Sequence, residues 1–310
     1  MIPSLVLASA VTLYWSQGIE SAPALREAGI ERLSVPPDEA AAWRKLGFRV
    51  TPTTVAELAS REKLPAPGIM ARPDLASATQ SPWIVASGWR FLRKPAGRYA
   101  YDLPVGKVSL AAAEAFVYGA DAVLKIDPAD LGAFGRMEAF LAELPKADLP
   151  AIADFAVVDD GAALMSEVMN LLVRRNLLFR IVDTPSSQYR INVKLGTREY
   201  PKEEAAHPSA FALKIRRQLG DEQRALRVYG SEVVVCRLTG DRTRVRLHLL
   251  NYGGREIEGV RIRLRGSYTQ GEVRLAGASP APLQDAVVAE GATEFSLPRM
   301  GPYAVVDLNP

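Results

Sequence analysis

The first 175 residues alternate short apolar runs, typical of buried strands, with segments of helical periodicity, and this alternation constrains the fold most strongly. Strands and helices in regular succession predict a parallel α/β sheet, because parallel neighbours need a crossover between them. The number of predicted strands, eight, is that of a closed β/α barrel. They lie at residues 11–15, 31–35, 48–51, 68–71, 83–87, 98–101, 122–126 and 155–158.

The length of this region argues against a complete barrel. About 165 residues, from 11 to 175, carry the eight strands, whereas a β/α barrel typically takes about 250 residues. The connections at 72–82 and 88–97 are short and rich in Pro and Gly, so we do not expect full helices there. We therefore predict a reduced (β/α)8-like barrel over residues 1–150, with an open sheet as the alternative.

Two further regions follow this barrel. Residues 151–224 form a small α/β unit and a linker helix at 208–219, and this unit is also a candidate to complete the barrel. From residue 225 onward, short strands are separated by Gly-containing turns at spacings of about 8–12 residues, which is typical of an antiparallel β-sandwich. The sequence thus predicts an α/β plus all-β chain with domains at 1–150, 151–224 and 225–310.

The charge and the rare residues indicate few special partners. A formal net charge of +3 over 310 residues is too small to indicate nucleic acid, and we expect no nucleic-acid partner. Alternate arginines at 242–246 and 261–265 share one strand face each, where we predict a solvated or docked sandwich face; nucleic-acid binding there is the weaker alternative. The single cysteine, Cys236, lies in an apolar strand pattern and is predicted to be a buried, inert thiol. Two histidines give poor support for a metal site, so we expect no cofactor and no metal.

The N-terminal residues leave the location open. No apolar run reaches the roughly 18 residues of a membrane span, and we expect no membrane partner. Residues 2–10 are apolar and end in Ala8-Ser9-Ala10, which is similar to a signal-peptidase site. They are either a trimmed remnant of a signal peptide or part of the first strand. We favour a secreted or periplasmic location over a cytoplasmic one.

Carboxylates at the ends of predicted strands are the main candidates for chemistry. Asp102, Asp127 and Asp160 follow the sixth, seventh and eighth strands, and a closed sheet brings such ends to one rim. Two carboxylates about 5–5.5 Å or about 6.5–9.5 Å apart are what glycoside hydrolysis needs. Asp127 and Asp160 also fit helix caps, because Pro128 or Gly161 follows them directly. Asp102 has no such explanation, since we predict a separate cap for the next helix, Ser109.

Aromatic and basic side chains near the same strand ends are candidate sugar contacts. Trp15 and Trp89 fall at or just after strand ends, where an indole face can stack on a sugar ring. Tyr101 and Lys107 flank Asp102 and complete the predicted substrate-binding set. Core packing is the alternative for each aromatic ring. We also weigh Glu114, an acid inside an Ala-rich helix, as a solvated residue or one held by a cation.

In the order of its three predicted regions, the chain resembles glycoside hydrolases of the β-galactosidase type. In those proteins a β/α barrel is followed by an amidotransferase-like unit and a β-sandwich. The residues that carry the resemblance are the runs at 154–160, 167–172, 177–181 and 301–308. The resemblance implies a carbohydrate setting, chemistry in the barrel, and a wing that serves in trimerisation, so a homo-oligomer is expected. No catalytic residue is carried over, because the wing holds no cysteine and the Asn-Glu pair of such barrels is missing around residues 68–74.

Two hypotheses follow from these features. The first is a carbohydrate-active protein, a glycoside hydrolase in which Asp102 works with Asp127 or Asp160 at the barrel rim. The second is a non-catalytic carbohydrate-binding or assembly protein on a degenerate barrel. Whether the chain is an enzyme depends on which of the two is right.

Overall fold

The computed structural model describes residues 11–70, 83–241 and 243–310. The chain forms two compact units, Met1–Gly68 with Lys94–Asp148 and Ile69–Arg93 with Leu149–Pro310. The signal-peptide candidate at residues 2–10 lies outside the described residues. The predicted division into three domains stays a prediction. None of the helices in the described part of the chain has the length and apolar character needed to cross a membrane.

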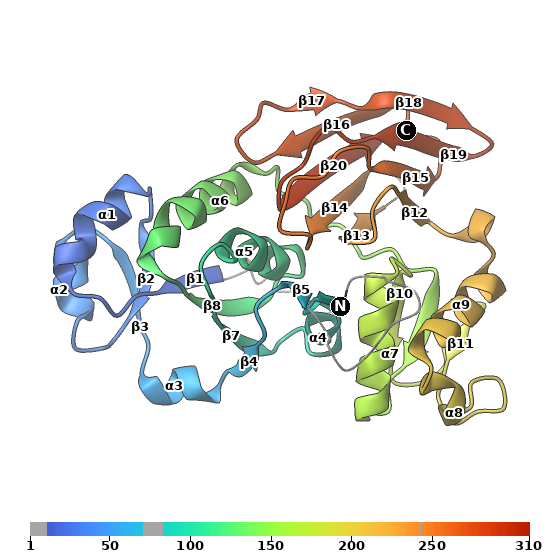
Figure 1. Cartoon of the computed structure of the whole chain (residues 1–310), viewed down its shortest axis with the longest axis horizontal. Helices are drawn as coiled ribbons and strands as arrows, with labels where there is room; N and C mark the ends of the chain where they lie inside the picture. Colours follow the sequence, from blue (N-terminus) through green and yellow to red (C-terminus); the bar gives the residue numbers. More distant parts are fainter. Residues whose placement is uncertain (1–10, 71–82, 242) are drawn as a thin grey trace. The chain divides into compact units, whose positions relative to one another are not determined.

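The first unit is built on one parallel sheet of six strands (Figure 1). Its strand order is β3-β2-β1-β8-β7-β4, and every neighbouring pair is parallel. Leu13 of β1 pairs with Leu33 on one side and Leu124 on the other, and all three side chains are fully buried. The strands are β1 (Val11–Tyr14), β2 (Arg32–Val35), β3 (Arg49–Pro52), β4 (Glu62–Leu64), β7 (Arg98–Asp102) and β8 (Asp121–Lys125).

This sheet departs from the predicted eight-stranded arrangement. Its edges are β3 and β4, and no strand pairing joins these edges among the described residues. The strands predicted at 68–71 and 83–87 instead form a separate two-stranded sheet, β5 (Gly68–Met70) with β6 (Trp83–Val85). The strand predicted at 155–158 is β9 (Phe155–Val158) of the second unit. The eight predicted strands therefore lie in three sheets.

A buried arginine lies where the chain leaves α3 and enters β4. A capping box between Thr54 and Glu57 begins α3 (Val55–Ser60), and Arg61 then leaves the helix with extended dihedral angles. The Arg61 guanidinium binds Asp121 Oδ1 at 2.8 Å and the carbonyl of Tyr99 at 3.3 Å. These bonds help to hold β4 beside β7.

The helices of the first unit carry its core. Nearly every residue of α5 is buried, Glu114 included, which is 0% exposed and accepts a hydrogen bond from Tyr101 Oη at 2.8 Å. The prediction that Glu114 is solvated is therefore wrong, whereas its pairing with a cation stays a prediction. The helices are α1 (Ala22–Glu27), α2 (Ala40–Lys45), α3, α5 (Val108–Val117) and α6 (Leu131–Glu143), with the short 3₁₀ segments η1 (Ile19–Ser21) and η2 (Pro128–Asp130).

The second unit begins with a small α/β layer. A three-stranded parallel sheet has the order β10-β9-β11, and all four residues of its central strand are buried. The helix predicted at 208–219 is confirmed as α9. The other elements are β10 (Phe179–Val182), β11 (Asn192–Val193), α4 (Gly88–Arg93), α7 (Ala163–Arg174), α8 (Lys202–Ala205), α9 (Pro208–Leu219) and η3 (Asp221–Gln223).

Charged contacts tie the segment around α4 to this layer. The Arg93 guanidinium binds both carboxylate oxygens of Asp159, at 2.7 and 2.8 Å, and also donates to Ser166. The guanidinium of Arg174 lies 3.9 Å from the ring centroid of Trp83. Bidentate arginine–carboxylate pairs fix geometry well. These contacts explain why residues 83–93 belong to the second unit and not to the sheet of the first.

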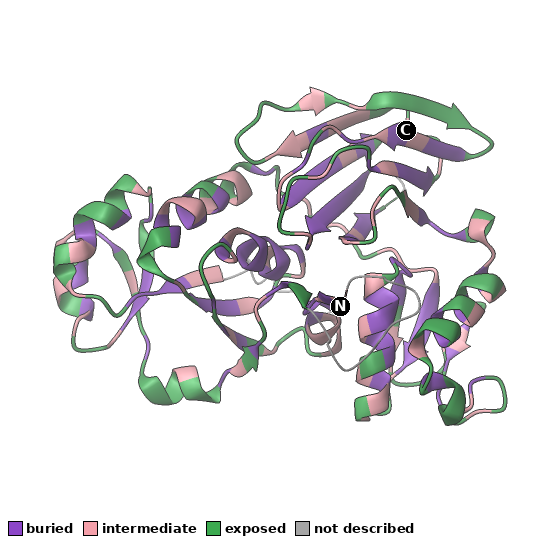
Figure 2. Ribbon diagram, in the orientation of Figure 1, coloured by how far each residue is buried: buried purple, intermediate pink, exposed green. Residues whose placement is uncertain are grey.

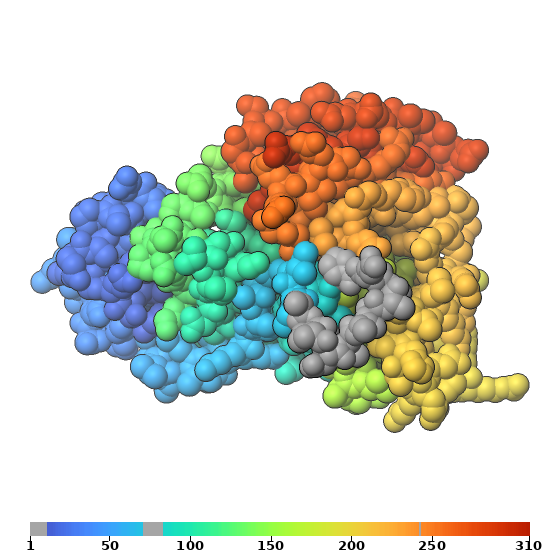
Figure 3. Space-filling view, viewed as in Figure 1, coloured from blue at the N-terminus to red at the C-terminus, as the bar shows by residue number. Residues whose placement is uncertain are grey.

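The rest of the second unit is the predicted antiparallel sandwich. Its two sheets have the orders β12-β15-β19-β18 and β13-β14-β20-β16-β17, and Figure 3 shows them as a continuous orange and red surface. The strands are β12 (Leu226–Tyr229), β13 (Val234–Gly240), β14 (Val245–Asn251), β15 (Arg261–Arg265), β16 (Gln270–Leu275), β17 (Ala281–Pro282), β18 (Gln284–Ala289), β19 (Ala292–Ser296) and β20 (Tyr303–Asn309).

Period-two alternation divides the residues of the sandwich between two environments. Leu247 and Leu249 of β14 lie in the core between the sheets, together with Cys236, whose burial raises the pKa of its thiol. Arg246 and His248 occupy the other face of β14, yet they too are buried, so the whole strand is coloured as buried in Figure 2. The outer face of this strand is therefore covered.

A close helix contact in the first unit gives a stability test. A Cβ added at Gly135 in α6 would lie 1.7 Å from the carbonyl oxygen of Ala28, whereas one at Gly132 meets only the end of the Arg136 side chain, at 3.3 Å. We expect Gly135→Ala to lower the free energy of unfolding by about 1–3 kcal/mol through overpacking. The matched Gly132→Ala should raise it by up to about 1 kcal/mol, since alanine favours helix. Urea titration of both variants measures this, and equal effects would contradict the packing shown.

The buried histidine of the sandwich gives a pH test. His248 Nδ1 lies 2.8 Å from Tyr303 Oη, and burial, followed by the charges of Arg237 and Arg246, lowers the pKa of His248 to about 3. At pH values between about 6.5 and about 3, His248 is protonated in the unfolded chain but not in the folded chain. The free energy of unfolding should therefore fall on acidification, by at most about 1.4 kcal/mol per pH unit.

The His248 contribution is isolated by comparing urea midpoints at pH 7 and pH 4.5. We expect His248→Gln to reduce the difference between the two midpoints. The exposed His207 serves as the control, so His207→Gln should leave this difference unchanged. A full pH dependence in His248→Gln would show that other groups cause it.

Candidate functional site

The carboxyl ends of β7 and β8 lie side by side in the first unit, and the predicted site residues Asp102, Lys107 and Asp127 lie at or just after these ends. Asp102 is the last residue of β7, and its side chain is 84% exposed. The ammonium group of Lys125, the last residue of β8, lies 3.8 Å from Asp102 Oδ2. Such an exposed ion pair contributes little to stability. Asp102 is thus open to water and free to contact a ligand.

The loops after these strands are held by carboxylates. Asp127 caps η2, as predicted, and accepts a hydrogen bond from the Ala129 N–H at 2.9 Å. Asp130 is 4% exposed, and its two oxygens accept from the Gly106 N–H at 2.9 and 3.1 Å. Gly106 has a φ of +82° and directly precedes Lys107. Asp130 therefore positions the loop that carries Lys107, a role that the sequence did not reveal.

The start of α5 differs from the prediction in detail. Lys107, and not Ser109, occupies the N-cap position, and the helix begins at Val108. Lys107 is half-buried, while the Ser109 hydroxyl donates to the carbonyl of Ala133 at 3.4 Å. The predicted cap at Ser109 is wrong because the tight turn at Gly106 already starts the helix.

Two of the predicted sugar-stacking rings lie in the core of the first unit. Trp15 is 2% exposed and donates from Nε1 to Ser21 Oγ at 2.8 Å. Tyr101 is 1% exposed and binds Glu114 through its hydroxyl. Both rings have the packed surroundings and satisfied polar tip that are usual for buried aromatic residues. Neither presents a ring face to solvent in this structure.

The remaining predicted residues, Asp160 and Trp89, belong to the second unit. Asp160 is exposed and accepts a hydrogen bond from the Ala162 N–H at 2.9 Å, just before α7. Trp89 is half-buried, and the Arg90 guanidinium lies 4.3 Å from its ring centroid. The neighbour of Asp160, Asp159, is partly buried, which alone would raise its pKa, but hydrogen bonds from Arg93 and Gly161 lower the pKa below its usual value. The catalytic and sugar-binding roles of all these residues stay predictions.

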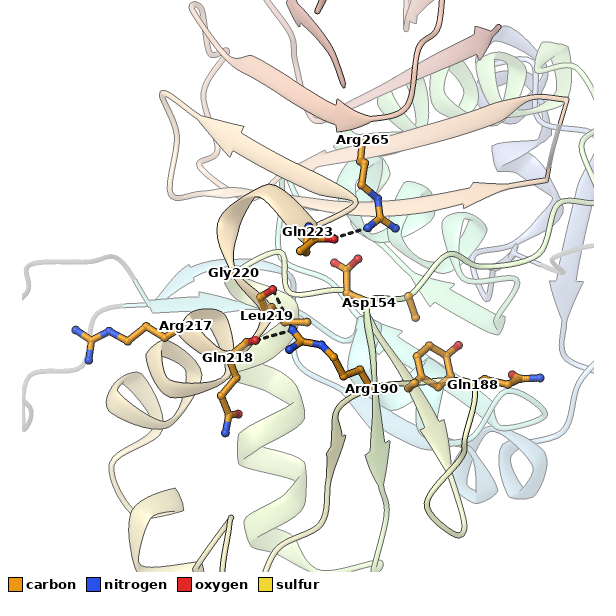
Figure 4. Close-up of a pocket in the computed structure, with 11 residues that line it drawn as sticks. Asp154, Gln188, Arg190, Arg217, Gln218, Leu219, Gly220, Gln223 and Arg265 are labelled. Carbon is orange, nitrogen blue, oxygen red and sulfur yellow. Dashed lines mark hydrogen bonds between the residues drawn. The ribbon is translucent and has the colours of Figure 1, made fainter. Parts of the chain in front are cut away.

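Sequence analysis missed a pocket of about 620 Å³ in the second unit (Figure 4). Asp154 lies just before β9, within a run that was noted only for the family resemblance. Its neighbours across the pocket come from the loop before β11, the end of α9, η3 and β15. The lining residues are Ala153, Asp154, Gln188, Tyr189, Arg190, Arg217, Gln218, Leu219, Gly220, Gln223 and Arg265.

Asp154 is the partly buried acid of this pocket. Its Oδ1 accepts a hydrogen bond from the Ala225 N–H at 2.9 Å, while Oδ2 is buried and has no partner among the described residues. Burial raises the pKa of Asp154 above its usual value, against the opposing effects of the Ala225 hydrogen bond and the charges of Arg265 and Arg224. The carboxylate therefore carries unsatisfied acceptor capacity inside a cavity.

Arginines provide the positive charge around Asp154. Arg190 donates from Nη2 to the carbonyls of Gln218 at 2.7 Å and Leu219 at 3.2 Å, at the carboxyl end of α9. Arg265 donates from Nη1 to the carbonyl of Gln223 at 2.9 Å. Figure 4 shows the Asp154 carboxylate directed toward the side where Arg265 lies, and Arg217 extending away. Within the described residues, no cluster of three or more His, Cys, Asp or Glu side chains is arranged to hold a metal ion.

No protein-family model and no curated protein matches the chain. Among solved structures, the chain is similar to α-L-fucosidase isoenzyme 2 from Paenibacillus thiaminolyticus, with a TM-score of 0.54 and 12% identity over 86% of this chain and 68% of the fucosidase. It also matches a GH42 β-galactosidase from G. stearothermophilus, with a TM-score of 0.42 and 8% identity. That match covers 68% of this chain and 53% of the β-galactosidase, so the chain spans about half of that protein.

The likeness to the fucosidase is one of fold. At this identity it shows that the chain has a glycoside hydrolase-like fold, and it does not single out the β-galactosidase type. That finer assignment stays a prediction.

The different settings of the strand-end carboxylates predict different costs of removal. We expect Asp130→Ala to lower the free energy of unfolding by about 1–3 kcal/mol, because the Gly106 N–H loses its acceptor. Asp127→Ala should cost about 0.5–1 kcal/mol as a lost cap, and Asp102→Ala less than about 0.5 kcal/mol. Urea unfolding of the three variants tests the order. A cost for Asp102→Ala as large as that for Asp130→Ala would contradict the exposed position of Asp102.

Proposed function

We propose that this protein binds carbohydrate and does not hydrolyse it. The observation that carries the carbohydrate part is the likeness in fold to an α-L-fucosidase over 86% of the chain. One fold can host several functions, so the likeness in fold supports carbohydrate binding by analogy. The side chains of the candidate sites provide a second kind of support. Each unit also has polar side chains suited to sugar hydroxyls, at the ends of β7 and β8 in the first unit and in the pocket of the second.

The settings of the predicted catalytic acids favour binding over hydrolysis. A glycosidase holds its general acid in surroundings that retain the proton, with a second carboxylate at a defined distance. Asp102 is instead 84% exposed, beside the cation of Lys125. Asp127 and Asp160 each accept a hydrogen bond from a backbone N–H two residues on, so these carboxylates already hold turns.

The strand order favours a reduced barrel as the origin of the first unit. In a closed barrel each strand lies beside its neighbours in the chain, and the first strand lies beside the last. The order β3-β2-β1-β8-β7 follows this rule, with β1 beside β8. β4 lies directly beside β7, at the place where a complete barrel has further strands. A barrel that has lost strands also fits a function in binding.

A glycoside hydrolase is the second candidate. Asp102 and Asp127 follow neighbouring strands, and catalytic residues of β/α barrels gather at such carboxyl ends. In this candidate Asp102 is a catalytic carboxylate with Asp127 as its partner in the same unit.

Binding and hydrolysis are separated by two assays on the full chain. We expect neutral and acidic mono- and oligosaccharides to change the intrinsic tryptophan fluorescence with saturation, and chromogenic glycosides to be released no faster than in buffer. Asp102→Asn and the exposed control Asp148→Asn should behave alike in the hydrolysis assay. Hydrolysis that falls about 100-fold or more in Asp102→Asn alone would establish the glycosidase instead. If none of the sugars binds with saturation, the proposal that the protein binds carbohydrate is wrong.

A further inference from the structure

The pocket around Asp154 requires a ligand that can donate hydrogen bonds. A carboxylate oxygen only accepts, and the Asp154 Oδ2 is buried in the pocket wall without a partner among the described residues. A buried acceptor left unsatisfied costs about 1–3 kcal/mol. A hydroxyl group donating to Oδ2 removes this cost, and sugars carry several hydroxyls on one ring.

The arginines of the same pocket require an acceptor, preferably an anion. Arg190 and Arg265 are each anchored through one guanidinium nitrogen to backbone carbonyls, which fixes the position of the charged fork. A guanidinium has five N–H donors, so these bonds leave donors for a bidentate contact with a carboxylate. The lining contains three arginines, Arg190, Arg217 and Arg265, but a single acid, Asp154, and Arg217 extends away from that acid.

Simple ligands satisfy only one side of this pocket. A neutral sugar donates to Asp154 but leaves the arginines without an anion. An inorganic anion pairs with the arginines but brings no donor for Asp154 and adds repulsion. The volume of about 620 Å³ falls within the range of small-molecule pockets, about 300–1,000 Å³.

We propose that this pocket binds an acidic sugar, a hexuronic acid, whose carboxylate pairs with Arg265 and Arg190 and whose hydroxyl donates to Asp154 Oδ2. This inference rests on the proposed carbohydrate-binding function and names its substrate class. Tyr189 and Gln188 also line this pocket, where they are available to contact the sugar ring.

Calorimetric titration of the full chain tests the assignment. Four probes are compared at low ionic strength: D-galacturonate, D-glucuronate, D-galactose and acetate. We expect at least one uronate to bind about tenfold or more tightly than both galactose and acetate, and its affinity to fall with added salt.

Variants then locate the binding. Arg265→Gln should weaken uronate binding about tenfold, and it should spare the fold because Arg265 is exposed and donates to the carbonyl of Gln223 at the end of η3. Asp154→Asn keeps an oxygen for Ala225 but replaces an acceptor by a donor, and should weaken binding similarly. The exposed Arg255 of the same unit does not line the pocket, so Arg255→Gln is the matched control and should leave the affinity unchanged. Near-ultraviolet circular dichroism verifies that each variant is folded.

The outcomes distinguish this inference from the proposed function. Binding of galactose as tight as that of the uronates, or uronate binding unchanged in both pocket variants, overturns the inference and leaves carbohydrate binding standing. Acetate as tight as the uronates reduces the pocket to an anion site and also overturns it. The absence of binding by any sugar overturns the inference and the proposed function together.

Discussion

Asn176 joins the α/β layer of the second unit to its sandwich, and much of this unit depends on the two hydrogen bonds of its amide. Nδ2 donates to the carbonyl of Val234 at 2.9 Å, and Oδ1 accepts from the N–H of Cys236 at 2.7 Å. The two backbone groups belong to β13, the edge strand of its sheet. Asn176 has a φ of +51°, a conformation that asparagine tolerates better than most residues. One residue thus ends α7 and satisfies a strand edge.

The same junction holds the acid of the pocket. The carbonyl of Asn176 accepts a hydrogen bond from Arg224 Nη2 at 3.3 Å, and the next residue, Ala225, donates to Asp154 Oδ1 at 2.9 Å. The pocket acid is therefore held by the backbone at the point where the chain enters the sandwich. Because its position follows from these local bonds, the orientation of Asp154 does not depend on the ligand. A site whose groups are already ordered loses less conformational entropy when a ligand binds.

The sequence was informative wherever structure is local. The helix at 208–219 and the cap at Asp127 were predicted because each depends on residues a few positions apart. Sheet membership was not predictable from such patterns. The strand at 155–158 looks like a further barrel strand, yet its partners are β10 and β11, and the Arg93–Asp159 pair that brings α4 to it joins residues 66 positions apart. Pairing over such distances leaves no local signal.

The carboxylates show why the candidate sites were harder to predict than the fold. An aspartate that follows a strand can stabilise a turn or bind a ligand. At Asp127 and Asp160, backbone N–H groups two residues further along donate hydrogen bonds to the carboxylate. Asp130 is buried and Asp159 is partly buried, and each has a partner distant in sequence, Gly106 or Arg93. Asp154 differs because burial deprives one of its oxygens of water while no described residue replaces it. That imbalance arises only after folding, and it marks Asp154 as the acid whose hydrogen bonding a ligand would complete.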